Sequence, residues 1–198
     1  IEQANGMLYA ATSRGYVYAI SRAGRVAWHA RLDAGVFSTP VLRNQRLYVA
    51  SQDGNLYRLN QATGAIEDRI QTGRVMSGSM AFAQGKLFLA NYQGEVISYD
   101  TERGRIDWRR STGNGLIVHL FAERGDLYVM SSDGLVLKYD AAGSRVWRAS
   151  LGGRIVVAPA FRDGHLHIAA GRALYVIDGA SGSVRWSYVM GSAPTTAV

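Results

Sequence analysis

The chain repeats itself with a period of about 40 residues, and this repeat constrains the fold more than any other feature of the sequence. Short apolar segments that begin with leucine recur at spacings of 39, 40, 40 and 39 residues. The five segments are Leu8–Ala11, Leu47–Ala50, Leu87–Ala90, Leu127–Met130 and Leu166–Ala169. Self-similarity at such a period is typical of folds in which one small structural unit is stacked many times.

Each repeat contains four apolar runs of about four to seven residues, which are rich in Val, Ile, Leu and Tyr and are separated by Gly, Asp, Asn and Ser. Two Asp-Gly pairs, Asp53-Gly54 and Asp133-Gly134, lie between alternating runs. This pair is a strong hairpin signal because a type I′ turn needs positive φ. No segment of helical length has apolar residues at helical spacing. The sequence therefore predicts an all-β chain with four antiparallel strands in each repeat.

Four-stranded units at this period are typical of a β-propeller, in which each sheet is a blade. One small sheet cannot bury both of its faces, whereas sheets stacked face to face around an axis can. Tryptophan occupies one repeat position in four of the five units, and we expect these indoles to dock neighbouring blades onto each other. They are Trp28, Trp108, Trp147 and Trp186. Asp68 occupies this position in the second unit, so we expect a weaker contact there.

We expect residues 1–198 to form a single propeller domain. The repeats are at about 8–46, 47–86, 87–126, 127–165 and 166–198. Three arrangements stay open: the five units belong to a larger ring, they close as a five-bladed ring, or several chains assemble into one ring. The larger ring is the favoured interpretation.

The repeat resembles that of the PQQ-like, or quinoprotein-type, propeller family, whose blade contains Leu-Tyr, Asp-Gly, a second Leu-Tyr, Thr-Gly and Trp in this order. Leu47 to Gly64 matches the first part, and the second part is matched by Asp100 to Trp108, Asp140 to Trp147 and Asp178 to Trp186. Within this family the arrangement is similar to the BamB-like group. The resemblance implies a non-catalytic scaffold that binds protein partners, among them components of outer-membrane protein assembly. It also implies a periplasmic or otherwise extracytoplasmic location, with membrane contact only through a lipid anchor or a partner.

The sequence offers little support for catalysis. It contains no cysteine, so thiolate catalysis, zinc–thiolate sites and iron–sulfur clusters are excluded. The quinoprotein dehydrogenases that the repeat resembles hold their cofactor with a vicinal cysteine pair, which this chain lacks. Nucleophile-elbow, Walker and dinucleotide-binding motifs are also missing. We therefore expect no enzyme activity, no cofactor and no metal, and a degenerate PQQ-dependent dehydrogenase is the least favoured alternative.

The chain is basic, with a formal net charge of +7, and all but two of its basic residues are arginine. Such a charge is compatible with binding to an acidic partner. The arginines either present a basic face to an acidic protein or occupy solvated turns. A nucleic-acid partner is not expected, because the aromatic residues follow the core register instead of alternating with arginine on one surface.

Two surfaces emerge as candidate binding sites. The linkers between blades and the turns between the second and third strands of each blade should lie on one face. Arginine and methionine in or near these linkers suit a protein-binding rim, and we predict that partner binding involves Arg74, Met76, Arg109, Arg110, Arg154 and Met190. The innermost strands should also line a channel with Thr39, Ser79 and His119. A small molecule bound there would fit the alternative hypothesis of a ligand-sensing domain in a larger receptor or enzyme.

Overall fold

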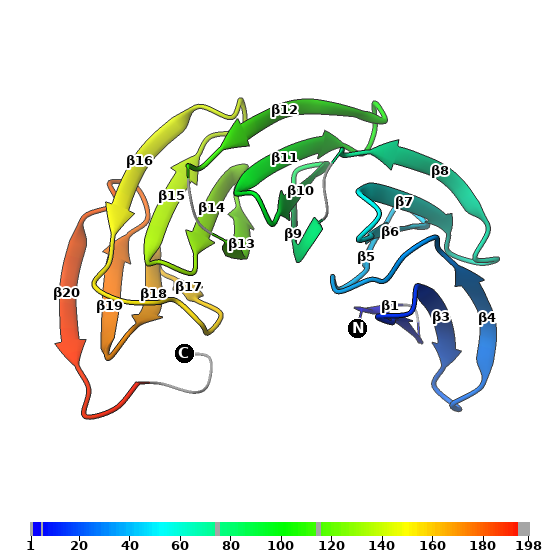
Figure 1. The fold of residues 1–198 in the computed structure, drawn as a ribbon, viewed down its shortest axis with the longest axis horizontal. Helices are drawn as coiled ribbons and strands as arrows, with labels where there is room; N and C mark the ends of the chain where they lie inside the picture. The colour runs from blue at the N-terminus through cyan, green and yellow to red at the C-terminus, as the bar shows by residue number, and fades with distance from the viewer. Residues whose placement is uncertain (1, 5, 74–75, 114–115, 194–198) are drawn as a thin grey trace.

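The computed structural model describes residues 2–4, 6–73, 76–113 and 116–193, and these residues form five four-stranded antiparallel sheets (Figure 1). The first sheet contains β1 (Glu2–Ala4), β2 (Met7–Ala11), β3 (Tyr16–Ser21) and β4 (Val26–Arg31). The second contains β5 (Val41–Arg43), β6 (Arg46–Ala50), β7 (Asn55–Asn60) and β8 (Ile66–Gln71). The third contains β9 (Met76–Ala83), β10 (Lys86–Asn91), β11 (Glu95–Asp100) and β12 (Arg105–Ser111).

The fourth sheet contains β13 (Ile117–Glu123), β14 (Asp126–Ser131), β15 (Leu135–Tyr139) and β16 (Arg145–Ser150). The fifth contains β17 (Ala160–Arg162), β18 (His165–Ala170), β19 (Ala173–Asp178) and β20 (Val184–Val189). Within each sheet the strands follow one another in chain order. No helix in the described part of the chain is long and apolar enough to cross a membrane.

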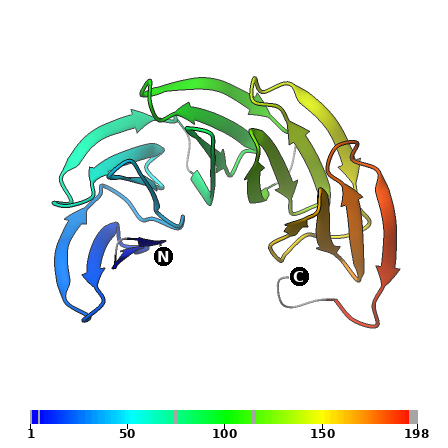
Figure 2. The same cartoon turned by 180° about the vertical axis from the view of Figure 1, so that it is seen from behind.

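The five sheets follow one another around an arc (Figure 1). The first strand of each sheet lies on the concave side and the fourth on the convex side, and the N-terminal and C-terminal sheets lie apart in both views (Figure 2). Radially arranged four-stranded antiparallel sheets are the blades of a propeller, so the predicted fold class is confirmed.

The sheets are offset by one strand from the repeats counted along the sequence. Each repeat was counted from its Leu-Tyr segment, which forms the second strand of a sheet. The last run of a repeat pairs with the segment that follows it: Val41 lies opposite Tyr48 and Leu42 opposite Leu47. Each sheet therefore combines the end of one repeat with the beginning of the next.

Proline shortens two of the innermost strands. Pro40 and Pro159 precede β5 and β17, which have three residues each. The corresponding strands β9 and β13 have no proline and run for eight and seven residues. Because proline cannot donate a backbone hydrogen bond, pairing before β5 and β17 is reduced to the isolated bridges Val36–Ser51 and Ile155–Ala170.

The hydrophobic core lies between sheets, in a separate layer for each neighbouring pair. Successive residues of a strand point to opposite faces, so one strand contributes to two layers. Leu87 packs with side chains of the second sheet, whereas Phe88 packs with those of the fourth. Both are essentially inaccessible to solvent. This explains why the middle strands are mostly apolar, with only scattered polar residues such as Arg58, Ser98 and Lys138.

Three tryptophans connect consecutive sheets through the same contact. Each indole lies on the glycine of the turn between the third and fourth strands of the next sheet: Trp28 on Gly64, Trp108 on Gly143 and Trp147 on Gly182. Each indole Nε1 also donates a hydrogen bond to a carbonyl oxygen of that turn region, at 2.9, 3.3 and 3.2 Å respectively. The docking role predicted for these residues therefore has a defined geometry, which we call the indole–glycine contact.

Two positions depart from this pattern. Trp186, in the last sheet, is half exposed. Asp68, at the tryptophan position of the second sheet, forms an ion pair with Arg58 at 3.5 Å. The layer between the second and third sheets instead contains Tyr48 and Tyr99, whose rings meet edge to face. The weaker contact that we expect between the second and third sheets stays a prediction.

Candidate protein-docking surface

One face of the arc is built by the linkers between sheets and by the turns between second and third strands. The first residue of each linker donates its backbone N–H to a carbonyl of that turn, at 2.7–2.9 Å. The five pairs are Leu32–Gly15, Thr72–Gly54, Thr112–Gly94, Leu151–Gly134 and Met190–Arg172. The linkers and these turns therefore share one face, as the sequence predicted, and we call this face the linker rim.

Glycine allows the close approach that forms the linker rim. Gly15 and Gly134 have φ of +82° and +90°, which L side chains rarely adopt. A Cβ atom at Gly15 would lie 2.6 Å from the carbonyl oxygen of Ala34 in the adjacent linker. The recurring turn glycines of the sequence thus mark where the linker crosses the turn.

Arg109 and Arg110, two of the predicted partner-binding residues, are engaged within the fold. Arg109 donates to the carbonyl oxygen of Thr72 at 2.7 Å and pairs with Glu95 at 3.5 Å. Arg110 donates to the carbonyl oxygen of Gly143 at 2.7 Å. Both guanidinium groups thus connect neighbouring sheets, which gives them a structural role that the sequence alone did not reveal.

The other predicted partner-binding residues differ in how far the structure describes them. Arg154 is exposed and lies on the linker rim. Met190 is half-buried beside Arg172, whose guanidinium donates to the carbonyl oxygen of Met190 at 3.4 Å. Arg74 and the side chain of Met76 lie outside the described residues. Partner binding by all of these residues stays a prediction.

Several exposed apolar side chains that the predicted partner-binding set does not include lie at or next to the linker rim. Phe37 and Val156 are 57% and 61% exposed, and Tyr92 and Leu116 are 43% and 38% exposed. Phe37 and Val156 each follow a buried residue that bridges to the next sheet, Val36 or Ile155. Alternation with these buried residues is the sequence signal that would have identified them.

The predicted channel residues lie on the concave side of three consecutive sheets. Thr39 is exposed and immediately precedes β5, and His119 is a half-buried residue of β13. The Nε2 atom of His119 is buried without a hydrogen-bond partner, and burial lowers the pKa of this imidazole. The side chain of Ser79 lies outside the described residues. The concave side therefore offers one unpaired imidazole nitrogen, and ligand binding there stays a prediction.

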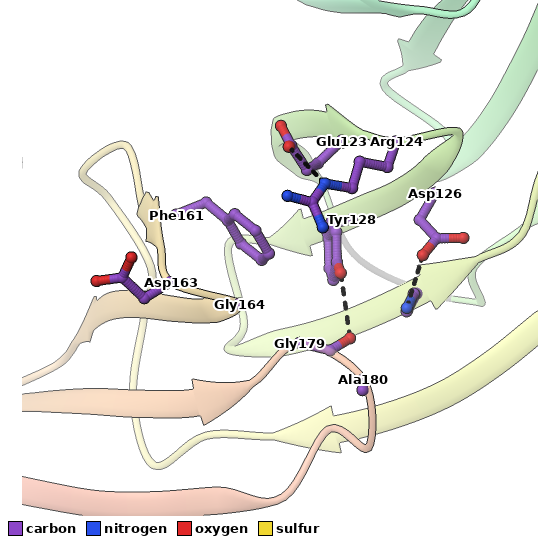
Figure 3. Close-up of a pocket in the computed structure, with 10 residues that line it drawn as sticks. Glu123, Arg124, Asp126, Tyr128, Phe161, Asp163, Gly164, Gly179 and Ala180 are labelled. Atoms are coloured by element: carbon purple, nitrogen blue, oxygen red, sulfur yellow. Dashed lines mark hydrogen bonds and ion pairs between the residues drawn. The ribbon is translucent and has the colours of Figure 1, made fainter.

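The opposite face carries a cavity of about 410 Å³ between the fourth and fifth sheets (Figure 3). Tyr128 and Phe161 form its aromatic wall, with ring centroids 5.4 Å apart, and the Tyr128 hydroxyl donates to the carbonyl oxygen of Gly179 at 3.1 Å. Lys138 is 8% exposed and pairs with Asp126 at 2.7 Å. Burial lowers the pKa of Lys138, but the hydrogen bonds and charge interactions with Asp126 and Tyr128 together outweigh burial and hold the pKa above its ordinary value. The ion pairs of this cavity, Lys138 with Asp126 and Arg124 with Glu123, are both formed within the fourth sheet.

Metal ligation has no support in the described part of the chain. No three His, Cys, Asp or Glu side chains lie close enough together there to hold a metal ion.

Comparison with known proteins agrees with this architecture. The family model described as "Outer membrane protein assembly factor BamB" matches residues 3–71 and 67–198, which together cover nearly the whole chain. The chain belongs to the BamB family. The expected resemblance to PQQ-like, BamB-type repeats is thereby confirmed. No curated protein sequence matches the chain significantly.

Two solved structures are similar to the chain over nearly its whole length. BamB from Moraxella catarrhalis matches 98% of the chain with a TM-score of 0.80 and 16% identity. The computationally designed Ika8 protein matches 99% with a TM-score of 0.83 and 16% identity. The chain spans 64% and 63% of their lengths. At this level of identity the two structures support the fold alone.

Proposed function

We propose that this chain is a non-catalytic scaffold that binds protein partners through its linker rim. In this proposal it acts in the periplasm and takes part in outer-membrane protein assembly. The match of nearly the whole chain to the BamB family model carries this proposal. The proposed partner is a component of the outer-membrane assembly apparatus, which fits the description of the family.

The composition of the linker rim supports a protein partner. Exposed Arg154 lies near exposed Val156 in one linker, and Phe37 occupies the corresponding part of another. Arginine and aromatic residues are enriched at the centres of protein interfaces. The backbone beneath these side chains is held by the repeated hydrogen bonds between linker and turn, so little conformational entropy is lost on binding.

Variants on the two faces test the proposal. The immobilised chain is incubated with detergent-solubilised outer membranes of its source, and retained proteins are identified by mass spectrometry. We expect retention of an outer-membrane assembly component, and a loss of at least about tenfold with the double variant Arg154→Glu, Val156→Ser, since truncated interface residues can each cost more than about 1 kcal/mol. Arg124→Glu, at an exposed turn of the opposite face, is the control and should retain the partner.

Two results would count against this function. Equal retention by the double variant and the wild type would show that the linker rim does not bind the partner. Reduction of an artificial electron acceptor by the chain supplied with PQQ and calcium would contradict its non-catalytic character.

A further inference from the structure

A second cavity lies between the first and second sheets, at the same repeat position as the cavity in Figure 3. Its volume is about 520 Å³, which is within the range of small-molecule sites. It lies on the face opposite the linker rim, because the turns between β5 and β6 and between β7 and β8 contribute to its wall. We call this cavity the amide pocket. Its wall includes Met7, Tyr9, Trp28, Gln45, Asn60 and Gln61.

The amide pocket is uncharged, although the chain has a formal net charge of +7. None of the described residues that line it is charged, whereas the cavity in Figure 3 is lined by five charged residues. Met7 stands at the repeat position of Asp126, and Ala19 stands at that of Lys138. An ionic ligand would lose hydration in the amide pocket without gaining a counter-charge from its wall. The pocket therefore favours an uncharged ligand.

The hydroxyl group of Tyr9 has no hydrogen-bond partner in the described part of the chain, although this residue is only 1% exposed. Tyr128, at the same repeat position, donates its hydroxyl hydrogen to the carbonyl oxygen of Gly179. The corresponding carbonyl oxygen in the second sheet, that of Gln61, accepts the indole Nε1 of Trp28 at 2.9 Å. A buried polar group without a partner costs free energy. Because Tyr9 lines the amide pocket, a hydrogen-bonding ligand there would recover this cost.

Two glutamine side chains add further donors and acceptors to the amide pocket. Gln45 and Gln61 stand at the repeat positions of Gly164 and Gly179, which have no side chain to offer. The backbone N–H of Gln61 donates to the carbonyl oxygen of Gln45 at 3.0 Å, so the two residues are held next to each other. Neither side-chain amide has a hydrogen-bond partner among the residues that the structure describes. Each amide therefore offers one acceptor and two donors to a ligand.

We propose that the amide pocket binds a neutral saccharide. Each hydroxyl group of a sugar both donates and accepts hydrogen bonds, which matches the hydroxyl of Tyr9 and the amides of Gln45 and Gln61. The C–H groups of a sugar ring suit the aromatic wall formed by Tyr9 and Trp28, whose ring centroids lie 6.1 Å apart. A purely apolar ligand would leave the three polar groups unpaired. A free sugar and a sugar unit of a glycan chain share this chemistry, and the experiment distinguishes them.

Isothermal titration calorimetry of the 198-residue chain with matched sugars tests the proposal. The probes are glucose and N-acetylglucosamine, which are neutral, glucosamine, which is cationic, and glucuronate, which is anionic. We expect at least one neutral sugar to bind about tenfold more tightly than either charged sugar, because the pocket offers no counter-charge. The β-1,4-linked trimer of N-acetylglucosamine distinguishes the two sources: tighter binding than the monomer supports a glycan chain, and equal binding supports a free sugar.

Variants in the amide pocket locate the binding. We expect Tyr9→Phe and Gln61→Ala each to weaken binding about three- to tenfold, because each removes one hydrogen-bonding group. Gln61→Ala keeps the carbonyl oxygen that accepts the indole of Trp28, so it replaces Tyr9→Phe if circular dichroism shows the latter to be unfolded. Tyr128→Phe removes the hydroxyl at the same repeat position of the other cavity and is the control, which should bind like the wild type.

Three results would overturn the proposal. They are no binding of any neutral sugar, tighter binding of a charged sugar than of the neutral ones, and an equal loss of affinity in Tyr9→Phe and Tyr128→Phe. None of them bears on the proposed function of the linker rim, because the amide pocket lies on the opposite face.

Discussion

At the scale of single residues, the recurring carboxylates act as caps of the turns between third and fourth strands. One oxygen of Asp100 accepts the backbone N–H groups of Glu102 and Arg103, at 3.0 and 2.8 Å. Asp140, Asp178 and Asn60 form equivalent bonds in their own turns. These residues are thus explained by backbone geometry, because a short side chain with an oxygen acceptor satisfies turn N–H groups.

Removal of one cap should cost measurable stability. We expect Asp100→Ala to lower the free energy of unfolding by about 1–2 kcal/mol because two backbone donors lose their acceptor. Asp100→Asn still places a side-chain oxygen acceptor in the turn and should lower the free energy of unfolding by clearly less. Urea unfolding followed by tryptophan fluorescence measures both, and equal losses for the two variants would contradict the capping role.

The same residue predicts how stability responds to acid. The backbone N–H of Arg103, together with that of Glu102 and the Arg103 guanidinium, holds the pKa of Asp100 below its ordinary value. A carboxyl with a lowered pKa stabilises the fold above its unfolded-state pKa, and this contribution is lost as pH falls through the folded-state pKa. Wild-type stability should therefore drop more than that of Asp100→Asn below about pH 4. Parallel pH profiles of the two proteins would refute this assignment.

Alkaline pH should unfold the chain through its buried tyrosines. Burial, followed by the hydrogen bond that its hydroxyl donates to Asp53, raises the pKa of Tyr57 to about 12. A raised pKa means that the stabilisation is complete below the unfolded-state value near 10 and is lost as pH rises through about 12. Phenolate absorbance should show a late-titrating tyrosine that is missing in Tyr57→Phe. An unchanged titration curve in that variant would contradict the assignment.

At the scale of elements, the indole–glycine contact holds one sheet on the next. Gly143 and Gly24 occupy the same turn with φ of +79° and +73°, but only Gly143 has an indole above it. Substitution of either glycine by alanine should lower the free energy of unfolding by about 1–2 kcal/mol, because alanine disfavours the left-handed backbone conformation. Gly143→Ala should cost about 1–3 kcal/mol more because its Cβ overlaps Trp108. Thermal and urea unfolding of the two variants measure the difference, and equal destabilisation would argue against the contact.

The sequence predicted the elements well because their signals are local. Positive-φ glycines and Asp-Gly pairs mark the turns, and runs buried on both faces mark the middle strands. Proline also had a local effect that the sequence contained but our prediction did not use: Pro40 and Pro159 shorten the innermost strands that follow them. Strand length was therefore less well anticipated than strand number.

At the scale of the whole molecule, the sequence did not reveal the contacts that a side chain makes with its neighbouring sheet. The partners of Arg109 and Arg110 include carbonyl oxygens about 33–38 residues away in sequence, so nothing near either arginine indicates that it is engaged. Trp186 occupies the same repeat position as Trp147, and no sheet in the described structure lies against it, so its docking role stays a prediction. The described part of the linker rim therefore combines exposed Arg154 and exposed apolar residues with two arginines that are engaged within the fold, and partner binding by the predicted residues stays a prediction.

We propose that this BamB-family propeller presents the linker rim, and not its other face, to a protein partner. Site-specific photo-crosslinking in the intact cell envelope tests it most directly, with the crosslinker placed at Phe37 or Val156 on one side and at Arg124 or Asp163 on the other. We predict that Phe37 and Val156 crosslink to the same outer-membrane assembly component and that the other two positions do not. Crosslinks confined to Arg124 and Asp163, or none from the linker rim, would contradict the account.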